Sequence, residues 1–577
     1  MVRKSLSLSI LIYLFFATSY ARFDSLKCAF GIDTLFLPIR NIDRCRKLNN
    51  TILLPYDDWG IKIASDYSGL PGYTIWVIRD NFTEVDPLFG NLPALWQESH
   101  FFKSKYLEGE INYQRAGYFE KPITGFKYYK GDYSFLNVSA FASGRYYDKG
   151  IWGLDFSNLG YDGRFGLLGS KYGVKTGESL AQNYRMGFET RVSTFSITAW
   201  IFYNKYMPGI VNYSTSEYNY TFGGTDKEYR RGGYISLKKL TKTKNFQAGV
   251  LTSGFYYSRN TGNLSLKGEG IHNQIYFNIQ KFSSNGSLGV NFRVFQNEFC
   301  ERGGGNLSQT KANFLLTGDF NRNTTKILFE TGIANLKPVA ELSIKQNIFR
   351  TLYLNMGYYR RFHLYPLIFS VMSDTLNKAP DFDKGFISNI GELGIEWKTK
   401  HIDFNLGFRH TIANFYMPLK SSPSFQLLNF NLRRERRLFF FSNIDIRFKN
   451  WVEFINRFVY APQSNRDINL VIYNISSLGG SFNILKNLKL SYYGSFWYTE
   501  GYEQLAWFEE VRSTGLIDFS VFNNEKLFLS FEIGARVKSF YIFYSFYNIQ
   551  GRLFSSLPLM PYRNRLFIYG VKWWFIE

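Results

Sequence analysis

The stretch Leu553–Glu577, LFSSLPLMPYRNRLFIYGVKWWFIE, ends the chain with side chains that alternate between two faces. One face carries Phe567, Tyr569, Val571, Trp573 and Phe575, and the other carries Ile568, Gly570, Lys572, Trp574 and Ile576. A period of two indicates a β-strand. In a soluble sheet a face this apolar needs a core to cover it, whereas in a membrane barrel it faces acyl chains and the aromatic girdle. The stretch therefore predicts a lipid-facing strand.

The other end of the chain has the features of a secretory signal peptide. Arg3 and Lys4 precede an apolar run, and a small-residue cleavage site ends at Ala21. We expect residues 1–21 to be removed, so that the mature protein begins near Arg22.

Composition favours strands over membrane helices. After the signal no run approaches the roughly 20 apolar residues that a membrane helix needs. Aromatic residues make up 19% of the chain, and there are 49 Gly against 15 Pro. In a chain that is exported by its signal peptide, this composition predicts an all-β protein, namely a transmembrane antiparallel β-barrel. The alternative is a large secreted β-rich protein, such as a sandwich array or a propeller.

Strand-like alternation recurs along residues 121–577 and predicts one large barrel. Apolar positions 288, 290, 292 and 294 oppose Gly289, Asn291 and Arg293, and similar patterns occupy 402–409 and 527–536. Several sandwiches would need linkers, whose composition is missing, so one barrel with a wet lumen is favoured. The runs number about 22, as in plugged transporters, rather than the ~16 to 18 of porins.

Loop lengths predict which edge faces outward, because outer loops are longer than periplasmic turns. Long connections are predicted near 205–227, 258–270, 297–309, 363–386 and 411–422, and tight turns near 241–245, 283–286 and 399–400.

The chain is strongly basic, with a formal net charge of +22. Because the basic residues are scattered and the chain is exported, we expect no nucleic-acid partner. Attraction to anionic lipid head groups or to an anionic solute is the functional interpretation. The alternative is that Lys and Arg simply occupy loops and lumen. Arginines concentrate at 230–231, 360–361 and 433–437, where head-group anchoring is favoured over a lumen lined for anions.

The closing stretch resembles the last hairpin of TonB-dependent outer-membrane receptors. In that family a Pro-x-x-x-Arg-like loop leads into an aromatic last strand with a glycine, and Pro561, Arg565 and Gly570 stand in those places. The C-terminal strand signal that this resemblance implies comprises Arg565, Tyr569, Gly570, Trp573 and Phe575, and barrel-insertion machinery would read it. The family usually stops on the aromatic residue, whereas Ile576 and Glu577 follow here.

Residues 22–120 resemble a shortened plug domain of the same family. A strand, an Asp turn and an Asp-Pro-Leu-x-Gly stretch follow in the family's order. The matching residues are Arg79, Asp80, Asp86, Pro87, Leu88 and Gly90. Asn81 replaces the usual glycine, and the later plug motifs are missing.

A short apolar segment near the mature N-terminus is similar to the family's energy-coupling box. It consists of Asp33, Thr34, Leu35, Phe36 and Leu37. The resemblance implies that this segment adds a strand to an inner-membrane energy-coupling protein. The alternative is an ordinary apolar strand.

The sequence offers little for catalysis. Cys28 and Cys45 are close enough to close a disulfide loop in an oxidising periplasm, which leaves Cys300 over. The five histidines lie in no catalytic or metal-ligand motif. We therefore expect no enzyme, no metal site and no cofactor.

The resemblance implies an outer-membrane transporter in a bacterial cell, which takes up an unknown small solute while the N-terminal domain occludes the lumen. Outer-membrane lipid would surround the barrel. The alternatives are a passive porin-like channel and a surface-binding or adhesive barrel.

Overall fold

The structure is a computed structural model. It describes residues 51–53, 61–66, 75–79, 123–132, 136–146, 150–161, 179–207, 212–214, 219–221, 224–241, 243–261, 264–302, 305–365, 369–370, 380–420, 429–448, 451–461, 470–501, 505–508, 513–517, 527–551 and 565–576.

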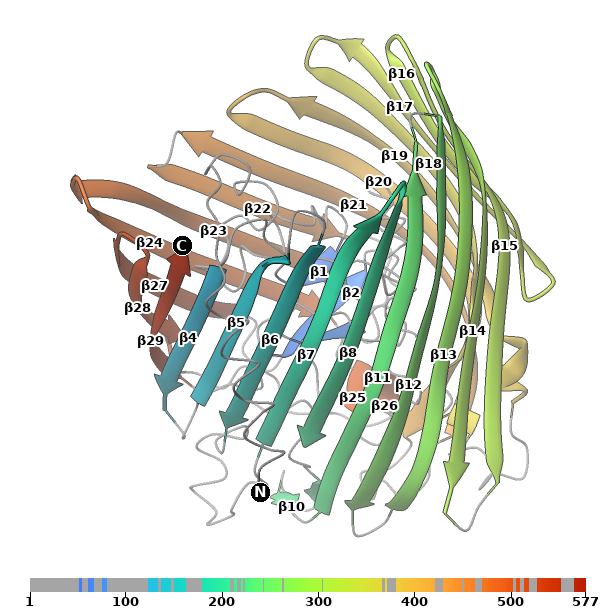
Figure 1. Ribbon diagram of the computed structural model, residues 1–577, viewed down its shortest axis with the longest axis horizontal. Coiled ribbons are helices and arrows are strands. Elements are labelled where there is room, and N and C mark those ends of the chain that lie inside the picture. The colour runs from blue at the N-terminus through green and yellow to red at the C-terminus, as the bar shows by residue number, and fades with distance from the viewer. Residues whose placement is uncertain are drawn as a thin grey trace.

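A closed antiparallel barrel dominates these residues (Figure 1). Its wall strands are β4 (Ile123–Gly131), β5 (Leu136–Tyr146), β6 (Gly150–Tyr161), β7 (Ser179–Val192), β8 (Phe195–Met207), β11 (Gly224–Leu240), β12 (Lys244–Thr261), β13 (Leu264–Ser283), β14 (Gly286–Glu301), β15 (Asn306–Arg322), β16 (Thr325–Ala334), β17 (Lys337–Phe349), β18 (Leu352–His363), β19 (Phe386–Lys398), β20 (Ile402–Lys420), β21 (Asn429–Phe448), β22 (Val452–Tyr460), β23 (Leu470–Leu485), β24 (Leu488–Gly501), β27 (Leu527–Val537), β28 (Phe540–Tyr547) and β29 (Leu566–Ile576). Within the described residues the wall thus has 22 strands, which confirms the predicted barrel.

The barrel closes where its last strand meets its first. β29 pairs antiparallel with β4, from Ile568 opposite Gly131 to Ile576 opposite Ile123. Every neighbouring pair in the wall is likewise antiparallel, so each backbone donor and acceptor row finds a partner strand. The strand that was predicted from alternation alone is therefore the strand that removes the barrel's free edges.

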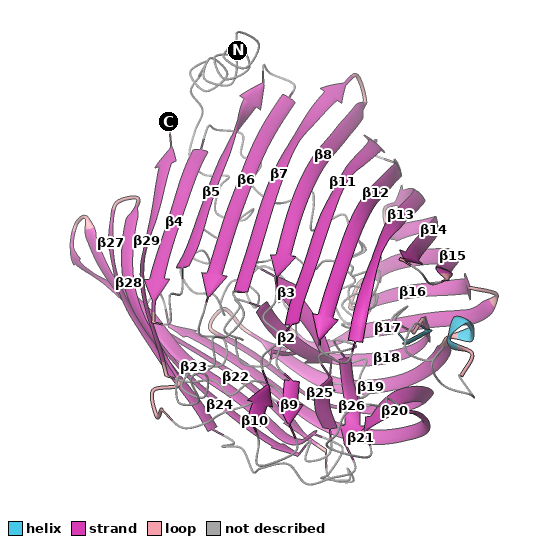
Figure 2. Ribbon diagram, turned by 90° about the horizontal axis from the view of Figure 1, so that it is seen from below, coloured by secondary structure: helices cyan, strands magenta, loops and turns pink. Residues whose placement is uncertain are grey.

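Smaller elements accompany the wall. β1 (Thr51–Leu53), β2 (Ile61–Asp66) and β3 (Ile75–Arg79) form a separate sheet, which both ribbon views draw within the outline of the barrel (Figures 1 and 2). β9 (Asn212–Ser214) pairs with β10 (Asn219–Thr221), and a 3-10 helix, η4, covers Phe382–Lys384.

The hairpin β25 (Leu505–Phe508) and β26 (Ser513–Ile517) belongs to the connection between β24 and β27. Those two wall strands pair directly with each other along eleven residue pairs. β26 instead lies parallel to the end of β20 for two residue pairs. The hairpin is therefore an insertion between the C-terminal end of β24 and the start of β27, and it does not add strands to the wall.

The two edges of the wall differ in their connections. At the edge that holds the C-terminus, neighbouring strands join through two or three residues, as at 193–194, 284–285 and 538–539. Ser193 and Lys538 adopt positive φ there, as tight hairpins require. At the opposite edge several connections are much longer, with 22 residues between β18 and β19 and 25 between β24 and β27. By this contrast we expect the edge with tight turns to face the periplasm.

The predicted tight turns are present, but three predicted long loops are wrong. β20 continues through 411–420, so its connection to β21 covers 421–428 instead of 411–422. β12 and β13 continue through 258–270 and are joined by two residues, and β14 and β15 continue through 297–309 with four residues between them. The outward side chains of these strand ends are polar, so these segments resemble loops in the sequence. The strands extend past the apolar part of the wall.

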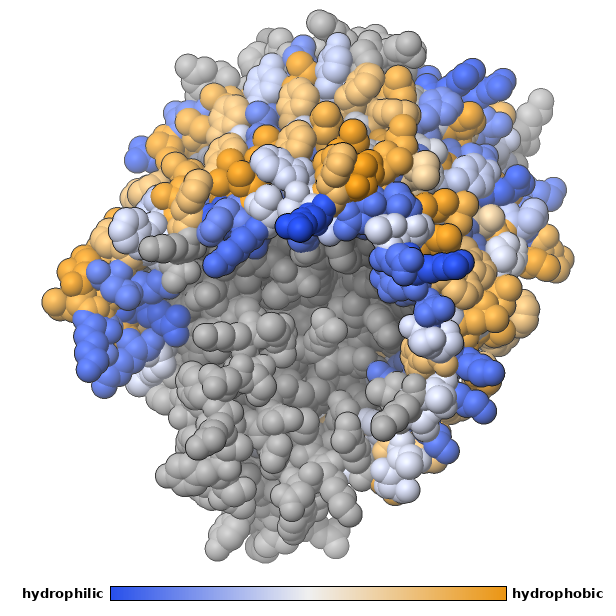
Figure 3. Space-filling view, turned by 90° about the horizontal axis from the view of Figure 1, so that it is seen from above, coloured by the Kyte–Doolittle hydropathy of each residue, from blue (hydrophilic) through white to orange (hydrophobic). Residues whose placement is uncertain are grey.

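The wall has an apolar outer face and a polar inner face. On β13 the exposed side chains Ile271, Ile275 and Ile279 point outward, whereas His272 and Gln274 are buried on the inner side. Figure 3 shows apolar side chains gathered on the outer surface, with hydrophilic ones along the edge of the opening. The outward positions therefore form an apolar band. Among the described residues no helix has the length and apolarity to cross a membrane.

The first prediction concerns this band. We expect Ile275→Arg to lower the free energy of unfolding by about 2–4 kcal/mol, because a guanidinium at the middle of the band loses its water. Urea titration in lipid bilayers measures the change. The folded fraction at each urea concentration is determined from heat-resistant mobility on gels. Ser265→Arg, on the same face of β13 beyond the band, is the matched control and should cost less than about 1 kcal/mol. Equal losses in both variants would contradict the placement of the band in hydrocarbon.

Candidate functional site

The inner wall of the barrel is crossed by buried ion pairs. Arg409 on β20 faces Glu392 on β19 in register. Its Nε and Nη2 donate to the same Glu392 oxygen, Oε2, at 3.1 and 2.8 Å, and both side chains have no exposed surface. Charged groups buried this completely must be paired, since an isolated charge in a dry site is very costly. The pair fixes the relative position of two strands at the lumen.

Two further arginines repeat the arrangement. Arg361 Nε donates to Glu341 Oε1 at 3.0 Å, and its guanidinium lies 4.7 Å from the centre of the Tyr359 ring. Arg230 Nη2 donates to Glu228 Oε1 at 2.8 Å. Each of these three inward guanidinium groups is thus neutralised by a nearby carboxylate of the wall.

Another inner-wall cluster centres on a single carboxylate. Glu532 accepts hydrogen bonds from the Tyr541 hydroxyl at 3.2 Å and from the Ser545 hydroxyl at 2.6 Å. Tyr541 also lies 2.9 Å from the Ser491 hydroxyl, so the network joins three strands. The inner surface of the wall is therefore polar here, and side-chain hydrogen bonds link neighbouring strands.

The arginine clusters seen in the sequence are divided between the two faces of the wall. Arg230 and Arg361 point inward, whereas Arg231, Arg434 and Arg436 are exposed. Adjacent residues of a strand face opposite sides, so each doublet contributes to both surfaces. The sequence predicted the clusters but missed the acidic partners, because pairs such as Glu392 and Arg409 are created by the register between strands.

An aromatic cluster lies at the outer end of the wall, between β18 and β21. Its rings belong to Tyr365, Phe369, Phe382, Phe386, Phe415, Tyr416 and Phe430. The Tyr365 hydroxyl accepts a hydrogen bond from the Tyr416 backbone N–H at 2.9 Å, and Gln309 Nε2 donates to the Tyr365 carbonyl at 2.8 Å. Burial raises the pKa of the Tyr365 hydroxyl above its ordinary value. The cluster therefore ties the 364–385 connection to the strands beside it.

The C-terminal strand signal is partly visible in the structure. Tyr569 and Trp573 are exposed on the outer face, at 39% and 42%, and Arg565 lies just before β29. A Cβ at Gly570 would come within 2.8 Å of the Tyr129 and Phe543 rings, so only glycine fits there. Phe575 lies in β29, and its side chain is outside the described residues. Recognition by insertion machinery stays a prediction.

Most of the N-terminal predictions fall outside the described residues. This holds for the energy-coupling box 33–37, for Cys28 and Cys45, and for Asp80, Asp86, Pro87, Leu88 and Gly90. Arg79 is the last residue of β3. Within the described residues Cys300 is an exposed free cysteine, and no group of three His, Cys, Asp or Glu side chains is placed to hold a metal ion.

Comparisons with known proteins identify the fold. No protein-family model matches the chain, and no curated protein matches it. Among solved structures, a variant of the ferric enterobactin receptor PfeA of Pseudomonas aeruginosa matches with a TM-score of 0.61 at 10% identity, over 80% of this chain and 81% of that one. The siderophore receptor PirA of Acinetobacter baumannii matches with a TM-score of 0.58 at 10% identity, over 80% and 81%.

A third solved structure matches at similarly low identity. The ferric preacinetobactin receptor BauA of Acinetobacter baumannii has a TM-score of 0.53 at 8% identity, over 79% of this chain and 80% of that one. Identities this low establish a shared architecture. The chain therefore has a barrel like that of TonB-dependent siderophore receptors, as its closing hairpin suggested.

The second prediction concerns the buried pair. We expect Glu392→Gln to lower the free energy of unfolding by about 3 kcal/mol, because the buried Arg409 charge loses its carboxylate. Asp403→Asn is the matched control on β20, where Asp403 pairs with Lys398 at 3.1 Å and both side chains are at least one-third exposed. This change should cost less than about 1 kcal/mol. The measurement is urea unfolding of the refolded barrel, and comparable costs for the two variants would show that burial of the pair is unimportant.

Proposed function

We propose that this chain is an outer-membrane transporter of the TonB-dependent kind, which takes up a scarce small solute. The observation that carries the proposal is the closed barrel of 22 described wall strands with an apolar outer face and a polar inner face. Barrels of this strand number hold a plugged lumen, whereas aqueous porins close with about 16 to 18 strands. A lumen this wide would leak solutes unless something occluded it.

Residues 22–120 are proposed to be that plug. The three-stranded sheet β1–β3 belongs to this region, and both ribbon views draw it within the barrel outline (Figures 1 and 2). The polar inner wall supports the proposal, because a folded insert with backbone and charged groups needs hydrogen-bonding partners on the wall. The plug-like motif from Arg79 to Gly90 would sit in this insert.

Energy for moving the plug is proposed to come from the inner membrane. The segment Asp33–Leu37 would leave the barrel at its periplasmic edge and add a strand to the periplasmic part of TonB. Support comes from the resemblance of the segment and from the fold shared with siderophore receptors.

The solute class to test first is a ferric siderophore. The structural neighbours are receptors for ferric enterobactin and ferric preacinetobactin. In this chain the buried aromatic cluster around Tyr365 anchors the connection between β18 and β19 at the outer end, where a solute would first meet the barrel. Transport, and not catalysis, is the activity proposed for the chain.

The third prediction tests energy coupling without knowledge of the solute. We expect Leu35→Pro to weaken binding of the purified periplasmic domain of TonB by at least about tenfold, because proline removes a backbone donor from the added strand. Surface-immobilised full-length protein in detergent gives the dissociation constant. Leu48→Pro, also N-terminal but outside the box, is the matched control and should bind like the unaltered chain.

Two outcomes would overturn the coupling proposal. One is an unaltered chain that does not bind the TonB domain, which would favour the passive channel or the adhesive barrel. The other is equal binding by the Leu35→Pro and Leu48→Pro variants, which would move the contact away from residues 33–37.

A further inference from the structure

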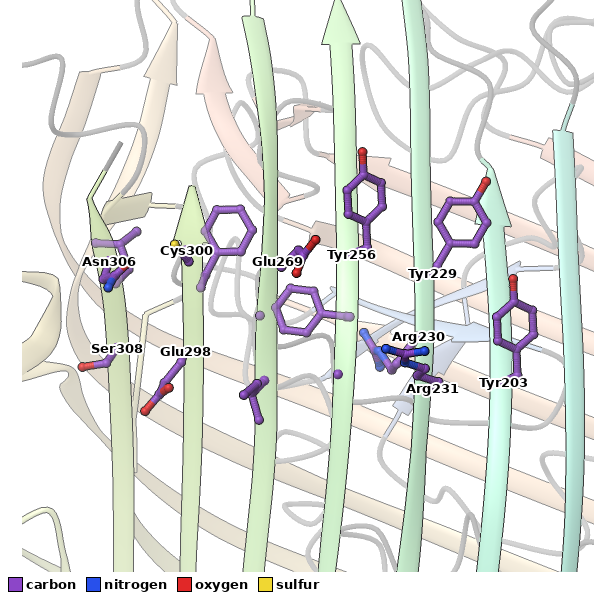
Figure 4. Close-up of a pocket in the computed structure, with 16 residues that line it drawn as sticks. Tyr203, Tyr229, Arg230, Arg231, Tyr256, Glu269, Glu298, Cys300, Asn306 and Ser308 are labelled. Carbon is purple, nitrogen blue, oxygen red and sulfur yellow. The ribbon is translucent and has the colours of Figure 1, made fainter. Parts of the chain in front are cut away.

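A hollow of about 720 Å³ lies on the outer surface of the wall, at the end of the apolar band, across β8 and β11–β15. Figure 4 shows Tyr203, Tyr229 and Tyr256 side by side on neighbouring strands, with Glu269 and Glu298 on the strands next to them. Residues that line the hollow from exposed outward positions include Tyr203, Arg231, Glu269, Glu298 and Ser308. The hollow is therefore open to the surroundings of the barrel and does not belong to its lumen.

Strand register arranges these side chains in two continuous rows. The first row runs through Tyr203, Arg231, Gly254, Ile271, Glu298 and Ser308, and the second through Lys205, Tyr229, Tyr256, Glu269, Cys300 and Asn306. Each member faces its neighbour directly across a strand pair. The tyrosines thus gather at one end of the hollow and the carboxylates at the other.

Glycine makes the hollow deep. A Cβ at Gly254, in the middle of the first row, would meet no atom closer than the Gly270 carbonyl oxygen at 4.0 Å. Behind this gap the Phe255 and Phe299 rings stack with their centres 6.1 Å apart and their planes within 8°. Both rings lie on the inner, buried side of the sheet, so the missing side chain leaves the backbone of the wall as the floor between the polar side chains.

The position of the hollow along the strands indicates what surrounds it. The next row toward the periplasm contains Thr252, whose hydroxyl donates to Asn273 Oδ1 at 2.7 Å. Beyond it the outward positions become apolar, as in the aligned residues Ile235, Val250 and Ile275. An amphiphile whose head group filled the hollow would place its acyl chain on this apolar row.

The polar groups in the hollow carry both charges. Among the described residues, neither Arg231 nor Glu269 has an ion-pair partner, so both remain available to a ligand. Gln296 Nε2 donates to Glu298 Oε1 at 2.6 Å, which leaves the other oxygen of Glu298 available. Two carboxylates beside one guanidinium disfavour a bare phosphate and suit a ligand with many hydroxyl groups.

The tyrosines suit the same kind of ligand. The Tyr229 and Tyr256 rings lie 6.1 Å apart and are tilted by 43°. The partly positive C–H groups of a sugar ring pack on the negative face of an aromatic ring, while its hydroxyl groups seek carboxylates, amides and guanidinium groups. We propose that this hollow binds the saccharide head group of a glycolipid in the outer leaflet. The proposal rests on the outer-membrane location proposed above.

The experiment uses the full chain in dodecyl dimethylamine oxide, a detergent without a sugar. Dodecyl maltoside, dodecyl phosphate and free maltose are added separately at equal concentration, and native mass spectrometry counts the adducts that remain. We expect dodecyl maltoside adducts on the unaltered chain. The combined change Tyr229→Ala and Tyr256→Ala should weaken their retention about tenfold, because two aromatic faces are lost.

The matched control is the combined change Tyr544→Ala and Tyr569→Ala. These tyrosines form another outward pair, with ring centres 6.4 Å apart, but they lie on β28 and β29. Retention of dodecyl maltoside should be unchanged in this variant, and heat-resistant gel mobility checks that both variants keep the barrel.

The proposal is overturned by equal loss in both double variants, by absence of maltoside adducts, or by preferential retention of dodecyl phosphate that Arg231→Gln abolishes. Binding of free maltose as strong as that of dodecyl maltoside would also overturn it, in favour of a soluble saccharide. TonB binding by the same double variants is measured in parallel. A chain that binds TonB but no saccharide amphiphile loses this inference alone.

Discussion

The pairing of the last strand with the first is the interaction on which the rest of the structure depends. Hydrocarbon offers no partner for a backbone N–H or C=O, so a sheet within it must have no free edge. The contact from Ile568 and Gly131 to Ile576 and Ile123 supplies that closure. Once the sheet is closed, its two faces meet different surroundings, and the alternation of each strand follows.

That alternation separates the side chains that face the membrane from those that face the lumen. The outer face places Ile275 and Phe292 in the apolar band, while the inner face buries charged groups such as Arg409 and Glu392. Beyond the band the outward positions turn polar, and inward positions such as Phe295 and Phe299 become aromatic. The polar hollow on the outside and the hydrogen-bonded inner wall are consequences of the same period of two.

The sequence predicts the fold well where the signal is local. The alternation at 567–576 and 288–294 depends on one strand at a time. Both segments are strands, and the described side chains of 567–573 and 288–294 have the expected faces. The misplaced loops at 258–270 and 297–309 have a physical cause, because a strand beyond the band resembles a polar loop. The pairing of Arg409 with Glu392 depends on the register of β19 against β20, which no single stretch of sequence contains. The hollow likewise combines residues of six strands.

Single-channel conductance in planar bilayers tests the central claim, that a wide barrel is closed by its own N-terminal region. The comparison is between the mature full-length chain and a chain that lacks residues 22–120. The account predicts a closed full-length protein and a large, steady conductance after deletion, since a lumen of this strand number is then empty. A steady open current from the intact chain would contradict the account and make this barrel a passive channel.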